Sequence, residues 1–187
     1  MKIDLHVHTA ERSPCADALE DEQIVTAIDR GLDALVFTNH ECLVPQEHLE
    51  ELNRTYTPFR VFGGVEITVR EKEDLLVLGI HDPALESRDW VHPDLHTFVR
   101  EKGGWIAVAH PFRFRPTINL DLERYTPDAL EVCSLNTPLL EQPHIREIAA
   151  RLGIQVLCNS DAHITRDIGA AYNLSLIHIS EPTRLRR

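Results

Sequence analysis

Three side chains near the start of the sequence have the types and spacing of a metal-binding strand. Asp4, His6 and His8 alternate with aliphatic residues in the run Asp4-Leu5-His6-Val7-His8. Side chains alternate faces along a β-strand, so these three share one face. Two imidazoles at positions i and i+2, roughly 7 Å apart at the backbone, can converge on one ion. The alternative is the solvated face of an edge strand, but burying such a face is costly unless its polar atoms are satisfied.

Further metal-competent side chains follow other apolar runs that read as strands. Each has an ordinary explanation by itself: His40 as a helix cap, Glu66 as a surface carboxylate, His110 as a core histidine. Their common position, at the carboxyl end of a predicted strand, favours a shared site instead. Together with the first strand they predict one mouth lined by His6, His8, His40, Glu66, His81, His110, Asp161 and His163.

The elements that must position these residues alternate between strands and helices. Short apolar runs predict strands, and 3.6-residue periodicity with acidic, proline or glycine boundaries predicts helices. This alternation predicts βα units in a mostly parallel sheet or barrel, whose active site would form at the carboxyl ends of the strands. The strands are expected at residues 3–8, 34–38, 60–65, 75–80, 105–109, 129–132 and 155–158, and the helices at 19–30, 45–53, 94–102 and 143–152.

Composition narrows the function classes. The chain has 187 residues and a net charge of −11, which suits one globular domain and disfavours a broad nucleic-acid-binding surface. Its four cysteines form no CxxC pair, so the sequence predicts neither a zinc ribbon nor a disulfide framework. Reduced thiols in the cytoplasm are expected instead. No run is apolar enough to predict a signal peptide or a membrane span. The oligomeric state cannot be predicted from the sequence.

Six motifs in this order resemble the PHP (polymerase and histidinol phosphatase) family. They are DLHVH, TNH, GVEIT, GIHDP, AHP and SDAH, and the resemblance extends from Met1 to about Asn173. It implies an α/β fold of the distorted (β/α)7 barrel type and a centre of two to three divalent metal ions. The chain is most similar to the small stand-alone phosphoesterases of that family.

Carried over residue by residue, the resemblance implies three adjoining metal sites. His6, His8, Glu66 and Asp161 would hold one ion. Glu66 would bridge to a second ion held by His81 and His110, and the remaining pair, His40 and His163, would hold a third. Imidazole with carboxylate suits Mn²⁺, Fe²⁺ or Zn²⁺ alike.

Two departures from the family pattern concern the third site. The family's TDH reads Thr38-Asn39-His40 here, so the residue beside the histidine can hydrogen-bond but supplies no charge. The loop at residues 9–17, TAERSPCAD, has no clean match to the family's ligand, and Cys15, Asp17 or Glu11 could substitute.

The chemistry implied is hydrolysis of a small phosphorylated substrate, such as a nucleotide, an oligonucleotide end or an amino-alcohol phosphate. Clustered divalent ions make hydroxide available near neutral pH. Arg113 and Arg115, in HPFRFRP, are expected to grip the phosphate from one side of an extended loop, although a solvated basic loop is the alternative. His163 or His40 could protonate the leaving oxygen where it carries no metal. The alternative functions are an amidohydrolase-like metal hydrolase and a non-catalytic metal-binding module.

The end of the sequence departs from the family pattern. Residues 174–187 resemble the translation of a sequencing adapter, so we expect a natural PHP-like domain at residues 1–173 and a non-native tail, with the last barrel elements missing. A genuine amphipathic end is the alternative. The run EKED at residues 71–74 is expected to be a solvated turn, and the histidines outside the strand ends are expected on the surface: His48, His92, His96 and His144.

Overall fold

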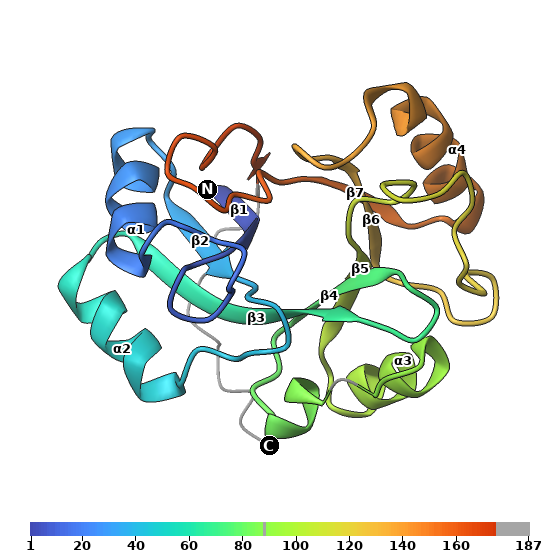
Figure 1. Cartoon of the computed structure of the whole chain (residues 1–187), viewed down its shortest axis with the longest axis horizontal. Helices are drawn as coiled ribbons and strands as arrows, with labels where there is room; N and C mark the ends of the chain where they lie inside the picture. The colour runs from blue at the N-terminus through green and yellow to red at the C-terminus, as the bar shows by residue number, and fades with distance from the viewer. Residues whose placement is uncertain (88, 175–187) are drawn as a thin grey trace, which may run out of the picture.

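A computed structural model describes residues 1–87 and 89–174, and the predicted tail from residue 175 onward lies outside the described residues. Eight strands form one sheet, and four helices of ten or eleven residues lie outside it (Figure 1). The strands are β1 (Lys2–Val7), β2 (Ala34–Phe37), β3 (Arg60–Thr68), β4 (Asp74–Leu78), β5 (Trp105–Val108), β6 (Ala129–Cys133), β7 (Gln155–Cys158) and β8 (Asn173–Leu174). The helices are α1 (Glu20–Asp29), α2 (Gln46–Thr55), α3 (His92–Glu101) and α4 (Gln142–Leu152), with short 3₁₀ turns η1 (Pro83–Glu86) and η2 (Leu139–Glu141).

The sheet is a nearly closed barrel, which confirms the predicted fold class. Its strand order is β7-β6-β5-β4-β3-β2-β1-β8. Neighbours run parallel except that β4 is antiparallel to both β3 and β5, and β8 is antiparallel to β1. A parallel crossover needs a dozen or more residues, and only residues 69–73 separate β3 from β4. The reversed direction of β4 is therefore forced by its short connection.

Side-chain amides hold the two ends of the sheet together. Asn159, just after β7, accepts a hydrogen bond from the backbone N–H of Leu5 in β1 at 3.2 Å and another from Asn173 Nδ2 at 2.7 Å. Asn173 in turn accepts from the backbone N–H of Cys158 at 3.1 Å. The backbone N–H of His8 donates to the Ala162 carbonyl at 2.9 Å, so the chain after β7 also lies against β1.

The helices pack on the outside of the sheet as their apolar periodicity predicts. Leu95 and Val99 of α3 and Ile145 of α4 share one buried cluster with the outward faces of β5 and β6. A second cluster joins α1 and α2 to β1, β2 and β3. The predicted boundaries agree with the structure to within two residues, except that β3 extends three residues beyond its predicted end. Helix α4, for example, begins beside a proline and ends at Gly153, whose φ of 68° lies in the left-handed region that glycine favours.

One of the four histidines expected on the surface is buried. His92, at the start of α3, is only 1% exposed, and its Nε2 has no hydrogen-bond partner. Burial, together with the nearby His96, lowers the pKa of His92 to about 4, although Glu71 and Asp121 act in the opposite direction. The prediction of a surface residue is wrong here because the first turn of α3 packs inward. Among the described residues, no helix is long and apolar enough to cross a membrane.

Replacing His92 by phenylalanine should flatten the acid side of the stability profile. A folded-state pKa below the unfolded value of about 6.5 means that unfolding takes up a proton, so stability is present above pH 6.5 and declines as the pH falls toward 4. We expect His92→Phe to abolish about 1–2 kcal/mol of the decline between pH 7 and pH 5, measured by urea unfolding at each pH. Parallel profiles for the two proteins would contradict the assignment.

Candidate metal centre

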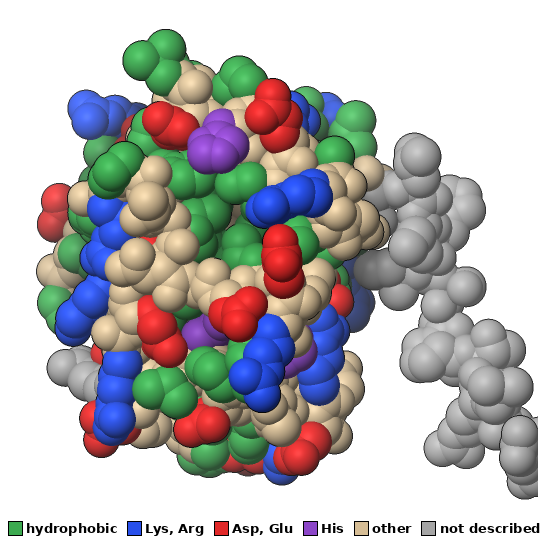
Figure 2. Space-filling view, turned by 90° about the vertical axis from the view of Figure 1, so that its right-hand side faces the viewer, with side chains coloured by type: hydrophobic (Ala, Val, Ile, Leu, Met, Phe, Trp, Pro, Cys, Tyr) green, Lys and Arg blue, Asp and Glu red, His purple; other side chains and the backbone are tan. Residues whose placement is uncertain are grey.

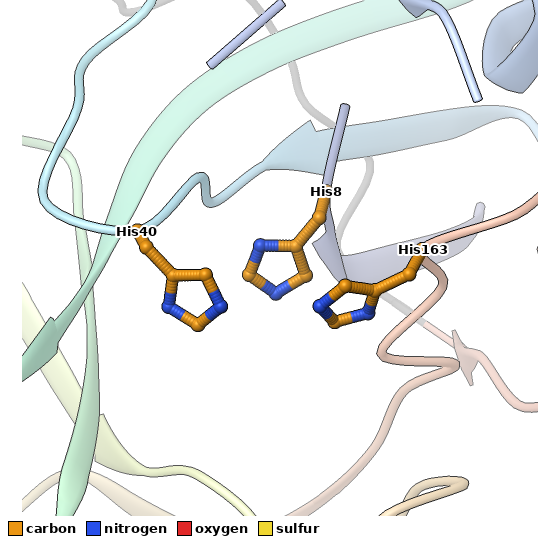
Figure 3. A group of neighbouring side chains, drawn as sticks. All are labelled: His8, His40 and His163. Atoms are coloured by element: carbon orange, nitrogen blue, oxygen red, sulfur yellow. The ribbon is translucent and has the colours of Figure 1, made fainter. Parts of the chain in front are cut away.

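Seven of the eight predicted ligands meet at one end of the barrel. His6 lies in β1 and His8 directly follows it, Glu66 lies in β3, and the others follow the ends of β2, β5 and β7. Figure 3 shows the imidazoles of His8, His40 and His163 side by side, although they come from three different segments of the chain. Combinations of three ligand atoms within 4.8 Å of one another include His6-His8-Glu66, His6-His110-Asp161, Glu66-Asp74-His110 and His8-His40-His163.

The centre of this group is a ring of four buried ligand atoms. His6 Nε2 lies 3.4 Å from Glu66 Oε2 and 3.2 Å from Asp161 Oδ1. His8 Nε2 lies 3.3 Å from each of the same two oxygens. None of these four atoms has a hydrogen-bond partner among the described residues. We call His6, His8, Glu66 and Asp161 the ligand quartet.

The quartet fits a divalent metal ion. Unpartnered polar atoms in a protein interior are costly, and a bound cation satisfies all four at once. Ligand atoms about 2.0–2.1 Å from a tetrahedral ion lie about 3.3–3.4 Å apart, which is close to the four distances in the quartet. Two imidazoles, which lose their protons when they bind an ion, and two carboxylates also form a donor set that Mn²⁺, Fe²⁺ and Zn²⁺ accept.

A buried carboxylate sets the orientation of His6. Glu131, on the inner face of β6, lies 3.1 Å from His6 Nδ1 and receives that proton, which leaves Nε2 for the quartet. The same carboxylate accepts hydrogen bonds from Asn159 Nδ2 at 2.7 Å and from the backbone N–H of His110 at 2.9 Å. Such a partner behind a ligating imidazole fixes its tautomer and raises its basicity.

A hydroxyl and an amide orient His8 in a similar way. Ser13 Oγ lies 3.3 Å from His8 Nδ1, accepts from the backbone N–H of His40 at 3.1 Å and donates to Asn39 Oδ1 at 3.0 Å. Asn39 Oδ1 also accepts from the backbone N–H of Thr9 at 2.8 Å. Asn39, where the family has aspartate, therefore anchors the loop after β1 through its oxygen, while its buried Nδ2 has no partner.

Glu66 faces two groups of ligands at once. Its Oε2 belongs to the quartet and also lies 3.0 Å from His40 Nδ1. Its Oε1 lies 2.9 Å from His110 Nε2, and Asp74 Oδ2 lies 3.9 Å from His110 Nδ1. A carboxylate with one oxygen in each direction suits a bridge between two cations.

The structure does not bring His81 into this centre, which corrects the prediction. His81 follows β4, and because β4 runs antiparallel its carboxyl end lies at the opposite end of the barrel. There His81 Nε2 lies 2.9 Å from the Val44 carbonyl oxygen, to which it can donate. Asp74, at the first residue of the same strand, occupies the position beside His110 instead. The turn expected at residues 71–74 therefore contributes a residue to the site.

Asp4 also lies outside the quartet, although the sequence pattern put it on the same face as His6 and His8. The register of β1 against β2 shifts between Asp4 and Val7, so strict alternation is broken there. The Asp4 carboxylate accepts from the backbone N–H groups of Ser160 and Gly169 at 3.1 and 3.4 Å. It anchors the chain that follows β7.

His8, His40 and His163 form a third group at the edge of the centre. The His8 ring centroid lies 4.5 Å from that of His40 and 4.2 Å from that of His163. The side chains of His40 and His163 are 31% and 22% exposed, so this group faces the solvent. The loop residues considered as additional ligands, Cys15, Asp17 and Glu11, belong to none of the ligand combinations in the described residues; the last accepts from the backbone N–H of Glu20 at the start of α1.

The surroundings shift the pKa of the inner histidine His6 and of the outer histidines His40 and His163 in opposite directions. Burial alone would lower the pKa of His6, but the carboxylates of Asp161, Glu131 and Glu66 raise it well above its usual value. Burial lowers the pKa of His40 to about 4, despite Glu66, and burial with the neighbouring His8 lowers the pKa of His163. The two outer imidazoles are therefore neutral at pH 7, as a metal ligand must be.

The arginines after β5 separate in the structure. Phe112 has a φ of 68°, so the loop is not extended and the two guanidinium groups do not face the same way. Arg113 Nη1 lies 3.5 Å from His110 Nε2, at the centre. Arg115 instead donates to the Glu71 carbonyl at 3.3 Å, which corrects the expectation that both grip one phosphate.

Four residues of the centre escaped the sequence analysis. Asp74 is the first residue of β4 and Glu131 lies within β6, whereas the sequence analysis considered only residues that follow the carboxyl end of a strand. Ser13 lies in a loop without a matching motif. Asn136 donates from Nδ2 to Asp161 Oδ2 at 2.6 Å, from the loop after β6. The inward position of Glu131 in an otherwise apolar strand, ALEVC, is the one signal that the sequence offered.

Comparisons with known proteins agree with this architecture. A family model described as PHP-associated (PHP_C) matches residues 143–183. A protein of Bifidobacterium adolescentis, provisionally assigned as a metal-dependent phosphoesterase, has 14% identity and a TM-score of 0.72, with 86% of this chain and 87% of that one covered. No match was found among curated proteins.

Two other solved structures share the fold. An amidohydrolase from Chromobacterium violaceum, solved with bound sulfate and no metal, has 18% identity and a TM-score of 0.71, with 94% and 93% of the two chains covered. The lesion-specific endonuclease PfuEndoQ from Pyrococcus furiosus has 18% identity and a TM-score of 0.66, with 92% of this chain but 51% of that one covered. At identities this low, the comparisons establish that the fold is shared, and the fold alone.

Replacing Glu131 by glutamine should weaken metal binding without removing a ligand. Loss of the charge behind His6 makes that imidazole a poorer donor, and changes of this kind cost about 10–100-fold in metal affinity. Titration of the metal-free chain with Mn²⁺ or Zn²⁺ by calorimetry measures the effect. Glu147→Gln, on the exposed face of α4, is the matched control, and equal affinity in both variants would contradict the role of Glu131.

Proposed function

We propose that the chain is a PHP-type metal-dependent phosphoesterase that hydrolyses a small phosphorylated substrate, a proposal supported by the match of residues 143–183 to a PHP-associated family model. The observation that supports this most directly is the ligand quartet, in which four buried ligand atoms converge without a hydrogen-bond partner. We propose that this centre holds two to three divalent ions, with Mn²⁺, Zn²⁺ and Fe²⁺ as candidates.

The three groups of ligands have different roles in this proposal. The quartet holds the first ion, and Glu66 with His110 and Asp74 holds the second. His40 and His163 hold a third ion at the exposed edge. His8 offers only Nε2 because its Nδ1 faces Ser13, so it serves the quartet.

When bound, such ions make a hydroxide nucleophile available near neutral pH and offset the charge of the phosphoryl oxygens. The chain's own residues position the substrate beside them. Arg113 supplies a planar, permanently charged donor at the edge of the centre, where a phosphate group would lie against it. The low pKa of His40 and His163 favours a ligand role over proton donation, so His163 as general acid is the weaker of its two candidate roles.

The charge of the chain favours a small substrate. A net charge of −11 repels a long polyanion, whereas cations at the centre and Arg113 attract a single phosphate group. We therefore favour a nucleotide, an oligonucleotide end or an amino-alcohol phosphate over a long nucleic-acid duplex.

An amidohydrolase-like hydrolase is the second candidate, because an amidohydrolase has a similar fold. A carboxylate, that of Glu66, occupies the bridging position, however. A non-catalytic metal-binding module is the third. The complete quartet and its supporting hydrogen bonds argue against it, because a centre without catalytic use has no need of this arrangement.

Phosphate release is the first measurement that we would make. The Mn²⁺-loaded chain should release phosphate from at least one member of a panel of nucleotides and small phosphomonoesters. His8→Ala removes a quartet ligand and Asp161→Asn removes the negative charge of another, so each should reduce release at least 100-fold. His48→Gln, on α2, is the control that should retain activity.

Two results would contradict the phosphoesterase. Unchanged release in both quartet variants would place the activity elsewhere. No release by folded, metal-loaded protein, combined with hydrolysis of amides or lactones, would favour the amidohydrolase-like candidate.

The two arginines provide an internal comparison of substrate binding. Arg113→Ala should raise the KM for the best substrate about 10–100-fold, because a hydrogen bond between charged groups is worth about 1.5–3 kcal/mol. Arg115→Ala should leave KM within about twofold, because its guanidinium donates to a backbone carbonyl away from the centre. Steady-state kinetics on both variants measure the difference, and an equal effect would show that the loop rearranges on binding.

A further inference from the structure

A second hollow lies outside the metal centre, between α4 and the long loop that follows β5. Its volume is about 390 Å³, at the small end of the range of about 300–1,000 Å³ for small-molecule sites. Figure 2 shows an apolar hollow on this face of the molecule, with histidine, basic and acidic side chains along its edge. The lining includes Phe112, Ile118, Leu120, Leu122, His144 and Ile148, and no member of the ligand quartet.

An aromatic pair forms one side of the hollow. The His144 ring stacks on Phe112, with centroids 5.0 Å apart and planes at 23°. Phe112 is nearly buried and has a φ of 68°, a conformation that costs a bulky residue free energy and is held by its surroundings. The backbone on either side of Phe112 carries His110 and Arg113, so the hollow and the metal centre share one segment of the loop.

The two edges of the hollow carry opposite charges. The loop contributes Asp121 and Glu123, and α4 contributes Arg151. Arg151 Nη1 lies 3.5 Å from Glu123 Oε1, with side chains 64% and 75% exposed. An exposed ion pair of this kind is worth only about 0–1 kcal/mol, so a ligand that supplies both charges can replace it at little cost.

We propose that this hollow binds a free apolar α-amino acid. The side chain would fill the apolar floor against Phe112 and Ile148. The carboxylate would meet Arg151, and the ammonium group would meet Glu123 and Asp121. Because Arg151 and Glu123 lie only 3.5 Å apart, their charges can meet the carboxylate and ammonium groups that an amino acid carries on one carbon, while the apolar floor accepts its side chain. Inorganic phosphate has no positive group for the acidic edge.

The test is calorimetric titration of the full, metal-loaded chain with L-phenylalanine and L-leucine. We expect a Kd below about 1 mM for at least one of them, a modest free energy of about −4 kcal/mol. Arg151→Glu reverses the charge of one edge at an exposed position and should weaken binding at least tenfold. Arg166→Glu, in the loop after β7, is the matched control and should bind like the unaltered chain.

Two further ligands separate the proposal from its alternatives. N-acetyl-L-phenylalaninamide keeps the side chain but lacks both charges, and it should bind at least tenfold more weakly than L-phenylalanine. Inorganic phosphate, as a probe of the metal centre, should not displace the amino acid. Absence of binding by both amino acids at 10 mM, equal binding of the uncharged amide, displacement by phosphate, or no effect of Arg151→Glu would each overturn the proposal. Because binding is measured without turnover, its failure is distinct from failure of the phosphoesterase.

Discussion

The convergence of four buried ligand atoms without hydrogen-bond partners among the described residues is the constraint on which the rest of the structure depends. Two imidazole nitrogens and two carboxylate oxygens cannot be buried this close together unless a cation or shared protons hold them. Each member of the quartet therefore has support behind it. Glu131 holds His6, Ser13 holds His8, and Asn136 occupies the second oxygen of Asp161. These second partners also restrict each ligand to one free atom, which turns a cluster of polar groups into a defined coordination site.

The quartet lies across the seam of the barrel, so the site exists only when the barrel closes. His6 lies in the first strand and His8 directly follows it, whereas Asp161 follows β7, more than 150 positions later in the chain. The seam is held by side-chain amides and a few backbone hydrogen bonds rather than by a continuous strand ladder. An ion bound by ligands from both sides of the seam would favour the closed form of the barrel. Its binding would then be coupled to folding, since a ligand that binds only the closed chain stabilises it.

Strand-end reasoning predicted most of the site because parallel strands carry their carboxyl ends to the same edge. Local patterns brought seven of the eight predicted ligands to this edge and gave the helix boundaries to within two residues. His81 failed because the direction of β4 depends on a connection too short for a crossover, and side-chain chemistry alone does not reveal direction. Glu131 was missed because a residue inside a strand becomes functional only when the barrel curvature brings it behind His6. The position of Arg115 was predicted wrongly because packing sets the conformation of its loop, including the positive φ of Phe112. The position of His92 was predicted wrongly because packing sets which side of α3 faces inward.

Backbone strain at the site indicates how the geometry is maintained. His110 and Asp161, two non-glycine ligands, have φ angles of 26° and 55°, and each such conformation costs of the order of 1–3 kcal/mol. The bonds that hold them come from β6 and the loop that follows it: Glu131 accepts from the backbone N–H of His110, and Asn136 donates to Asp161. Strand β6 is fixed in turn by the buried apolar cluster under α3 and α4. The strain is thus supported by core packing that does not involve an ion, so the ligand atoms are directed toward one point by the protein itself and ion binding needs little rearrangement.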